Sequence, residues 1–178
     1  MAIKSRKRLV IDASVLRAAG QSDHPTSHRC RAFLDEVLRI CHKAVVSGSA
    51  ATEWRRHSSR FSLAWQAAMA SRGKLMYEDP PPVADLRTAV DALTAAADQV
   101  AATKDLHLVE AALAADYVVA SLDDRARRVF ALVSKDVAAL RAVAWANPSL
   151  DDRAVLLWLR EGALAGTQRR LGDDATNP

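Results

Sequence analysis

The sequence predicts a three-layer α/β/α fold with a central parallel sheet of at least four strands. Short runs rich in β-branched residues occur at 8–11 and 117–122. Such nearly continuous apolar runs are typical of strands that are buried on both faces of a parallel sheet. Segments with helical periodicity alternate with these runs, as expected for right-handed β-α-β crossovers.

In the amino-terminal half we expect strands at about 8–12 and 44–47. Pro25 opens an amphipathic helix between them, in which apolar residues recur at three- and four-residue spacing. After the second strand, Gly48 is expected to make the turn, and Ser49 is the predicted N-cap of the next helix. Glu53 then lies just past the first turn of that helix.

The carboxyl-terminal half continues the alternation. The segment 74–77 is ambiguous, and the Asp-Pro-Pro-Pro sequence at 79–82 predicts a stiff connector. A helix that begins at Thr103 or Lys104 would hold Asp105 in its first turn. The other expected elements are helices at about 62–71, 83–97, 124–133 and 150–161, the last capped by Ser149 and ended by Gly162, and strands at 117–122 and 142–146.

Length and composition indicate one domain. The 178 residues are half hydrophobic, so we expect a single folded unit over 1–165 and a disordered polar tail over 166–178. Apolar stretches are much shorter than the roughly 18 residues of a membrane span. The basic amino end leads directly into a strand and does not resemble a signal peptide. We therefore expect a cytoplasmic protein with no membrane contact and with Cys30 and Cys41 reduced.

Four carboxylates are predicted to share one edge of the sheet. Asp12 and Asp123 each end a strand, and ligands of open α/β sheets bind beyond the carboxyl ends of the strands. Glu53 and Asp105 are expected near the starts of helices on that same side. Four converging carboxylates repel each other unless a counter-charge is present. Mg²⁺ or Mn²⁺ prefers oxygen ligands and activates water against phosphodiesters, so the set predicts a metal-dependent nuclease.

Each acid also has a simpler interpretation. Asp12 could be a turn residue, Glu53 a solvated helix residue and Asp105 a residue that favours a helix start. Asp123 and Asp124 compete for one role, in which one acid binds metal while the other caps the following helix. Asp123 is preferred because it follows Ser121 by two residues, so that both side chains lie on one face of an extended chain.

Three other site types were weighed. A zinc site built from histidines and cysteines is disfavoured because their spacings, at His24, His28, Cys30, Cys41 and His42, fit no common pattern. A haloacid-dehalogenase-type phosphatase would need an acid where Ser14 stands. A nucleotide-binding fold would need a glycine-rich loop after the first strand, where the sequence is Asp-Ala-Ser-Val.

Basic residues follow two of the acids. Arg55, Arg56 and Arg60 come after Glu53 on what is expected to be the same helix, and Arg125 comes after Asp123. Arginines beside a metal site would bind the phosphates of a nucleic acid. The alternative is an ordinary solvated helix face, and the net charge of +4 permits a nucleic-acid partner without requiring one.

Four segments in order resemble the PIN domain family of divalent-metal-dependent nucleases. Their order, their spacing and the placement of each acid match over residues 8–150. The segments are LVIDAS at 9–14, Glu53, KDLHLVEAAL at 104–113 and VVASLDD at 118–124. The resemblance implies Asp12, Glu53, Asp105 and Asp123 as metal ligands. It also implies Ser14 and Ser121 as polar residues beside those ligands. Asp124 is expected beside the site because it directly follows Asp123.

The resemblance further implies an activity and partners. Many small bacterial PIN proteins are VapC-type toxins of toxin–antitoxin modules, and this chain is longer than the compact ones, mainly within 62–104. We expect a Mg²⁺- or Mn²⁺-dependent endoribonuclease that leaves 5′-phosphate and 3′-hydroxyl ends. RNA as substrate, a small antitoxin as partner and a homodimer are expected by resemblance only. The alternative is a catalytically silent PIN-like module that binds RNA or protein.

Overall fold

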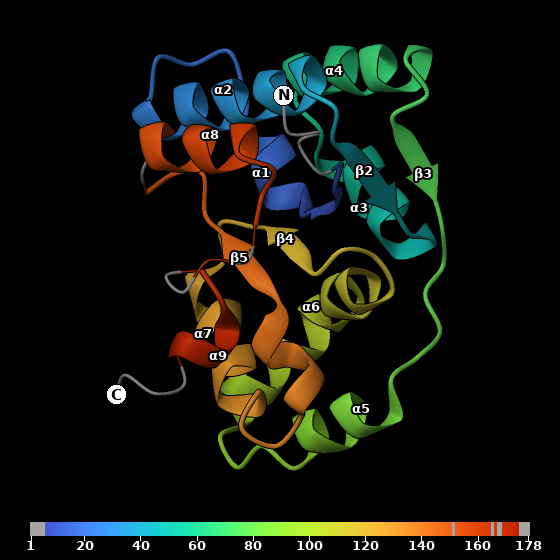
Figure 1. Cartoon of the computed structure of the whole chain (residues 1–178), viewed down its shortest axis with the longest axis vertical. Helices are drawn as coiled ribbons and strands as arrows, with labels where there is room; N and C mark the ends of the chain where they lie inside the picture. The colour runs from blue at the N-terminus through green and yellow to red at the C-terminus, as the bar shows by residue number, and fades with distance from the viewer. Residues whose placement is uncertain (1–5, 151, 165, 167–168, 175–178) are drawn as a thin grey trace.

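The computed structural model describes residues 6–150, 152–164, 166 and 169–174 (Figure 1). Within these residues five parallel strands form one sheet, in the spatial order β3-β2-β1-β4-β5. The strands are β1 (Arg8–Ile11), β2 (Lys43–Val46), β3 (Leu75–Tyr77), β4 (Val118–Ala120) and β5 (Ala144–Ala146). The predicted fold class is confirmed, and the ambiguous segment at 74–77 supplies the edge strand β3.

Helices cover both faces of the sheet. Leu9 and Ile11 of β1 pack into one helical layer, whereas Val10 packs into the other, because successive side chains of a strand point to opposite faces. The first layer contains α1 (Ala13–Ala18), α2 (Pro25–Arg39), α3 (Gly48–His57), α4 (Arg60–Ser71) and α8 (Asp152–Arg160).

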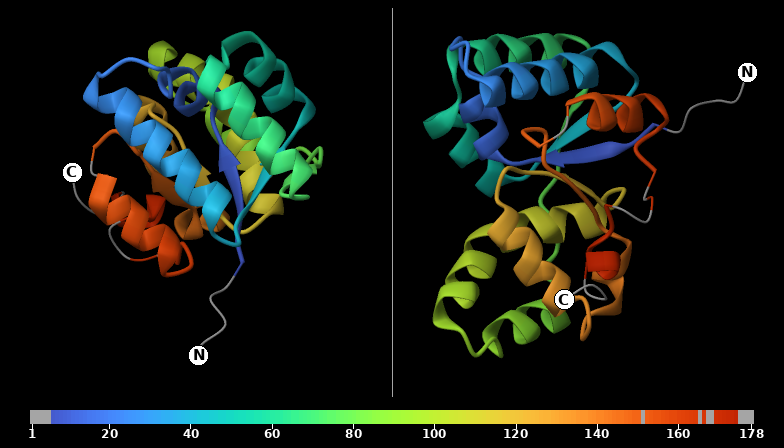
Figure 2. Two further views of the ribbon diagram at one scale, coloured as in Figure 1. Left: turned by 90° about the horizontal axis from the view of Figure 1, so that it is seen from above. Right: turned by 90° about the vertical axis from the view of Figure 1, so that its left-hand side faces the viewer.

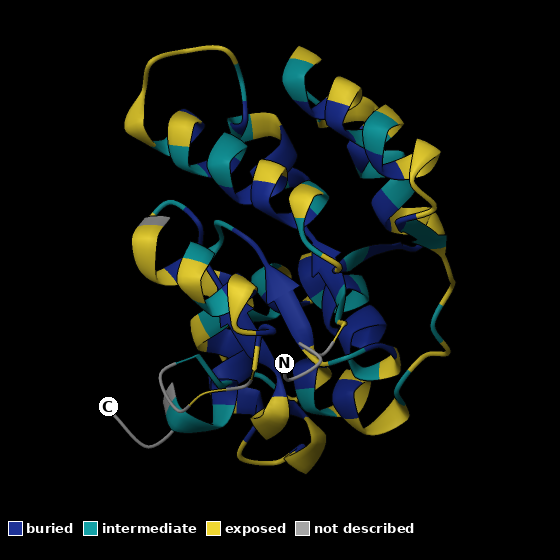
Figure 3. Cartoon of the chain, turned by 45° about the horizontal axis from the view of Figure 1, so that its top comes forward, coloured by how far each residue is buried: buried dark blue, intermediate teal, exposed yellow. Residues whose placement is uncertain are grey.

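The second layer lies on the opposite side of the strands, as the right-hand view of Figure 2 shows. It contains α5 (Ala84–Asp91), α6 (Ala96–Ala114), α7 (Asp124–Val133), the 3₁₀ helix η1 (Ala138–Ala142) and α9 (Leu171–Asp174). Buried residues concentrate in the strands and on the inner helix faces (Figure 3). Trp65 and Trp145 are both buried in the core, and Trp158 packs partly buried against it.

The strand order reverses direction at β1. From β1 the chain moves outward to β2 and β3, and it then returns to the other side of β1 to form β4. The helices that follow β1 and β4 therefore lie on opposite faces and leave a crevice at the carboxyl ends of these two strands. Ile11 pairs with Ala120, and the Asp12 amide donates to the Ala120 carbonyl at 2.9 Å. This register places Asp12 beside Ser121.

Two helix starts differ from the prediction. The N-cap of α3 is Ser47 and not Ser49, because the Ser47 hydroxyl accepts a hydrogen bond from the Ala50 amide at 3.2 Å. Helix α3 ends at His57, and Ser59 caps a new helix, α4, through the Ser62 amide. Arg60 therefore lies on α4, and the expectation that it shares a helix with Glu53 was wrong.

The position of Asp105 in its helix was also predicted wrongly. The expected helix at 83–97 is in fact two elements, since α5 ends at Asp91 and α6 begins at Ala96. Helix α6 then continues through Thr103, so Asp105 lies in its middle and not in its first turn. The dipole of α6 does not favour an ionised Asp105, because a helix dipole acts only near a helix end.

The carboxyl end packs more closely than expected. The Trp145 amide donates to the backbone carbonyl of Arg169 at 2.8 Å, and the Leu171 amide donates to the backbone carbonyl of Val143 at 3.0 Å. The Leu171 side chain is fully buried. Part of the predicted disordered tail over 166–178 is thus attached to β5, whereas 175–178 lie outside the described residues. Helix α8 begins at Asp152, and Ser149 donates to the Asn147 side chain.

Two smaller expectations can be compared with the structure. Cys30 is buried, Cys41 is exposed, and both are free thiols. Among the described helices none combines the length and the apolar character needed to cross a membrane.

Candidate functional site

Asp12 is held at the crevice by two hydroxyl groups. It directly follows β1, and its carboxylate makes no capping bond to α1. Instead, Ser121 Oγ donates to Asp12 Oδ2 at 2.7 Å, and Ser14 Oγ donates to the same oxygen. Ser14 and Ser121 in turn accept hydrogen bonds from the amides of Leu122 and Asp123, both at 3.1 Å. This network fixes Asp12 and favours a site residue over a simple turn residue.

Asp105 reaches the same crevice from the middle of α6. The residue is 2% exposed, and its Oδ2 atom is buried without a hydrogen-bond partner. Burial raises the pKa of Asp105 to about 7, with the charge of Asp12 as the next cause and smaller contributions from Asp123 and Glu53. The four predicted acids are therefore within electrostatic range of each other.

Lys104 provides the positive charge closest to these acids. Its ammonium lies 3.6 Å from Asp105 Oδ1 and 3.8 Å from Asp123 Oδ2. Asp105 contributes most to raising the pKa of Lys104, and Asp123 and Asp12 add to that rise. The Lys104 side chain is 66% exposed, so it covers the crevice from the solvent side and is free to move away.

Glu53 approaches from α3 and faces His107 of α6. The distance between His107 Nε2 and Glu53 Oε2 is 3.6 Å, which is too long for a hydrogen bond. His107 Nε2 is buried and has no hydrogen-bond partner, and Nδ1 lies 3.1 Å from the Lys104 carbonyl. Because that carbonyl can only accept, Nδ1 carries a proton and Nε2 is directed at the carboxylate.

Asp123 combines the two roles for which Asp123 and Asp124 were expected to compete. Asp123 caps α7, since its Oδ1 accepts from the Ala126 amide at 2.9 Å, but its Oδ2 faces Lys104 and the crevice. Asp124 Oδ1 instead accepts from Asn147 Nδ2 at 3.0 Å. Asp123 thus serves as cap and site residue at once, and Asp124 connects the site to the end of β5.

The oxygen donors of the four acids suit a divalent cation, but the side chains stand too far apart to enclose one. Among the described side chains, no three of the His, Cys, Asp or Glu type stand close enough to enclose a metal ion. The four acids nevertheless offer only oxygen donors, which Mg²⁺ and Mn²⁺ prefer. Oδ2 of Asp105 is a buried oxygen with no hydrogen-bond partner among the described residues. Inward movement of the half-buried Glu53 side chain and withdrawal of Lys104 would be needed to complete a site.

The predicted arginines differ in their freedom to bind a substrate. Arg55 donates to Thr52 on its own helix at 3.1 Å, and both Arg55 and Arg56 are exposed. Arg60 is exposed at the start of α4. Arg125 is engaged with Asp98 at 3.0 Å, so its guanidinium is already neutralised within the chain. The structure therefore weakens the expectation for Arg125 and leaves the other three available.

The sequence analysis assigned no role to three residues of the crevice. Lys104 and His107 flank Asp105 on α6, and Asn147 follows β5 in the way that Asp12 follows β1. Asn147 is buried and binds both Asp124 and Ser149. The signal for Asn147 was its place at a strand end, whereas nothing in the local pattern distinguishes Lys104 from a solvated lysine.

Comparisons with protein-family models, with curated proteins and with solved structures gave no match.

Proposed function

We propose that this protein is a Mg²⁺- or Mn²⁺-dependent endoribonuclease with a PIN-like site. The observation that carries the proposal is the gathering of Asp12, Glu53, Asp105 and Asp123 at the switch point of the sheet, where Asp105 has a raised pKa and an unpartnered oxygen. Buried charge without a partner is costly, and it is retained most often where function requires it. The resemblance of the segments around these acids supports the same activity.

The residues of the crevice have distinct roles in this proposal. Asp12 and Asp105 would hold the metal, and Ser14 and Ser121 keep Asp12 in position. Asp123 Oδ2 and Glu53 would add oxygen ligands from the outer side. The bound ion supplies Lewis acidity and a lowered pKa for water at neutral pH. Lys104, once displaced from the acids, is placed to contact the phosphate of the substrate strand.

A cleavage assay on RNA tests the proposal directly. Purified protein should cut RNA in Mg²⁺ or Mn²⁺, lose this activity in EDTA and regain it on addition of either ion. The products should carry 5′-phosphate and 3′-hydroxyl ends. Asp12→Asn serves as the matched control for a contaminating nuclease. Cleavage that continues in excess chelator, or that is equal in Asp12→Asn, would contradict the proposal.

The toxin role rests on the resemblance alone. On that reading the natural partners are a small antitoxin and a second copy of this chain. Induced expression of the wild-type protein in a bacterial host should arrest growth, and Asp12→Asn at equal abundance should not. Normal growth with abundant, active enzyme would separate the nuclease activity from a toxin role.

One observation favours the catalytically silent alternative. Lys104 already neutralises Asp105 and Asp123 without a metal, as an internal cation does in a structural ion cluster. A silent module would bind RNA or protein equally well in EDTA and in Mg²⁺. It would also show no Mn²⁺-dependent rise in melting temperature, whereas a metal-binding enzyme should show one.

A further inference from the structure

A second charged region lies at the opposite end of the sheet from the acidic crevice. Arg6 precedes β1, Lys43 begins β2 and Lys74 precedes β3, so all three residues lie at the amino ends of their strands. In the right-hand view of Figure 2, β1 runs from the side of the N-terminus toward α1, which separates the two ends clearly.

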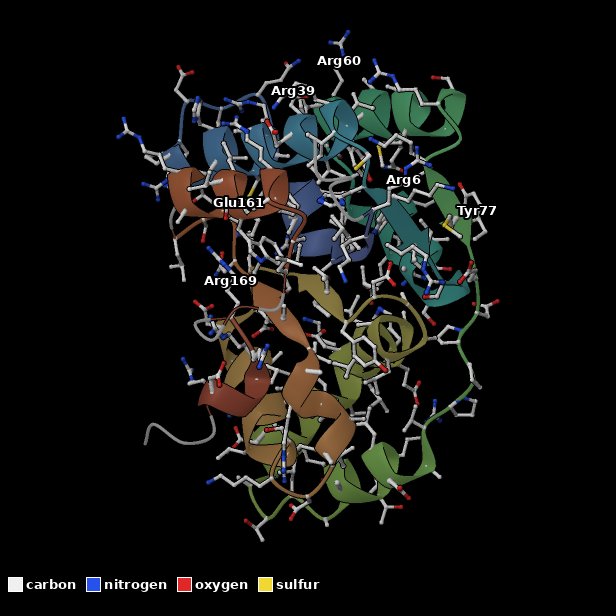
Figure 4. All side chains as sticks on the ribbon, in the orientation of Figure 1. Arg6, Arg39, Arg60, Tyr77, Glu161 and Arg169 are labelled. Atoms are coloured by element: carbon white, nitrogen blue, oxygen red, sulfur yellow. The ribbon has the colours of Figure 1, made fainter. Side chains whose placement is uncertain are left out.

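These residues line a hollow of about 310 Å³, which we call the basic hollow. Five cationic side chains line it, and among the described lining residues none is acidic. The five are Arg6, Arg39, Lys43, Arg72 and Lys74, and the exposed thiol of Cys41 lies among them. Figure 4 labels Arg6 and Arg39, which both lie in the upper half of that view.

Two of the five cations are fixed to the backbone. Lys74 is buried, and its ammonium donates to the carbonyl oxygens of Val37 at 2.5 Å and Leu38 at 2.9 Å. Arg72 Nη1 donates to the Leu38 carbonyl at 3.1 Å. Burial lowers the pKa of Lys74, and the nearby charge of Arg72 lowers it further. The chain therefore holds like charges together at a cost that a bound anion would remove.

The other three cations have N–H groups that make no hydrogen bond within the described residues. Arg39 uses Nε and Nη2 on Glu36, which leaves Nη1 available. No ion pair or side-chain hydrogen bond within the described residues engages Lys43 or Arg6. By contrast, Arg8 on the same side of the sheet is neutralised by Glu78 and Asp116. Glu36 pairs with Arg39 from beside the hollow, so within the described residues the cations of the hollow without an acidic partner are Arg6, Lys43, Arg72 and Lys74.

From this arrangement we propose that the basic hollow is an anion-binding site for phosphate groups, separate from the acidic crevice. Arg39, Arg72 and Lys43 would donate hydrogen bonds to the phosphate oxygens, because guanidinium and ammonium groups bind phosphate strongly. Buried Lys74 contributes charge, since its protons already bind carbonyl groups. The phosphate could belong to a small molecule or to the backbone of a nucleic acid, and both present the same chemistry.

Titration of the full chain in EDTA tests the site, because the chelator prevents phosphate from binding through a metal at the crevice. The first probe is inorganic pyrophosphate, followed by calorimetry, and the second is a single-stranded RNA oligonucleotide. The variant is Lys43→Gln, whose half-buried side chain makes no ion pair or side-chain hydrogen bond with the described residues. The matched control is Lys135→Gln, an exposed lysine that removes the same charge from a distant surface.

Lys43→Gln should weaken pyrophosphate binding by roughly three- to fivefold, the size of one partly exposed charge contact, and Lys135→Gln should leave it unchanged. If wild-type protein binds only the oligonucleotide, Lys43→Gln should lower the slope of log K against log salt by about 0.7, and the phosphate source is a nucleic acid. Equal losses in both variants, or no binding of either probe, would overturn the proposal.

Discussion

Helix α6 carries two buried carboxylates, Asp105 and Glu110, whose charges are neutralised in different ways. Glu110 accepts two hydrogen bonds from Arg87, at 2.8 and 2.9 Å, and one from the Val83 amide at 2.9 Å. Asp105 has only Lys104 at 3.6 Å and an oxygen without a partner. Burial alone would raise both pKa values, but hydrogen bonds to Arg87 and Val83 outweigh it and lower the pKa of Glu110.

The difference distinguishes a structural acid from a site acid. A buried carboxylate that only joins two helices is fully hydrogen-bonded, as Glu110 is between α5 and α6 and as Glu36 is with Arg39 and Arg160. Asp105 is surrounded instead by other acids. Asp105 and Glu110 are therefore similar in burial and in charge. Only their hydrogen-bond partners indicate that Asp105, and not Glu110, is suited to bind a cation.

The largest expected effect concerns cleavage. Asp105→Asn should reduce metal-dependent RNA cleavage on the order of 10²-fold or more, because it removes a charged metal ligand at the reacting centre. Glu110→Gln should leave the rate per folded molecule within about threefold, since Glu110 does not face the crevice. Initial rates at saturating RNA measure both. Similar losses in the two variants would abolish the distinction between them.

The pH dependence of stability should have opposite signs at the two acids. The pKa of Asp105 is about 7 in the folded state, whereas the ordinary value for an aspartate is 3.8. The unfolded state thus loses this proton first, so in EDTA stability should fall by up to about 4 kcal/mol as pH rises from about 4 to 7. In Asp105→Asn, the free energy of unfolding measured by urea titration should change little over this pH range. A wild-type curve that rises over this range would contradict the assignment.

Glu110 should affect the pH dependence of folding stability at acidic pH. Folding lowers its pKa, so its contribution to stability is complete above the ordinary glutamate pKa of 4.5 and is lost as the pH falls below that value. Glu110→Gln should cost about 1–3 kcal/mol at pH 7, because it weakens the pair with half-exposed Arg87. The penalty should diminish at low pH. A cost that is independent of pH would indicate lost packing and not a lost charge.

A smaller effect is expected from the cation beside Asp105. Lys104→Met removes a charge that competes with a metal, so the apparent Mn²⁺ affinity should increase by roughly five- to tenfold. The Mn²⁺-dependent shift in melting temperature gives this affinity without any RNA. Arg87→Met is the matched control and should leave Mn²⁺ affinity unchanged. A weaker Mn²⁺ affinity in Lys104→Met would show that Lys104 supports the site and does not compete for it.

The sequence was sufficient for four of the five described strands, all except β3, and for the acids at the ends of β1 and β4. The apolar runs before Asp12 and Asp123 mark β1 and β4, and the switch-point rule then places both acids at one crevice. The break between α5 and α6 could not be predicted, because the segment around it contains no glycine or proline. Thr94 is a capping-type residue, but it does not mark the boundary, since α6 starts after Ala95 without a side-chain cap. The role of Lys104 depends on tertiary distances, which no local pattern encodes.

The smallest expected effect on the folded protein concerns the basic surface near Glu53. If Arg55, Arg56 and Arg60 contact phosphates, changing all three to Ala should lower the slope of log K against log salt by roughly 0.7 for each contact. The three side chains are exposed on two successive helices, so stability should change by less than about 1 kcal/mol. Cleavage at saturating RNA should survive, because these residues are not metal ligands.

Arg125→Ala offers the informative contrast, since its pairing with Asp98 predicts no change in slope. An unchanged slope in the triple variant would make this an ordinary solvated surface, and an altered slope in Arg125→Ala would show that the Asp98 pair opens when RNA binds.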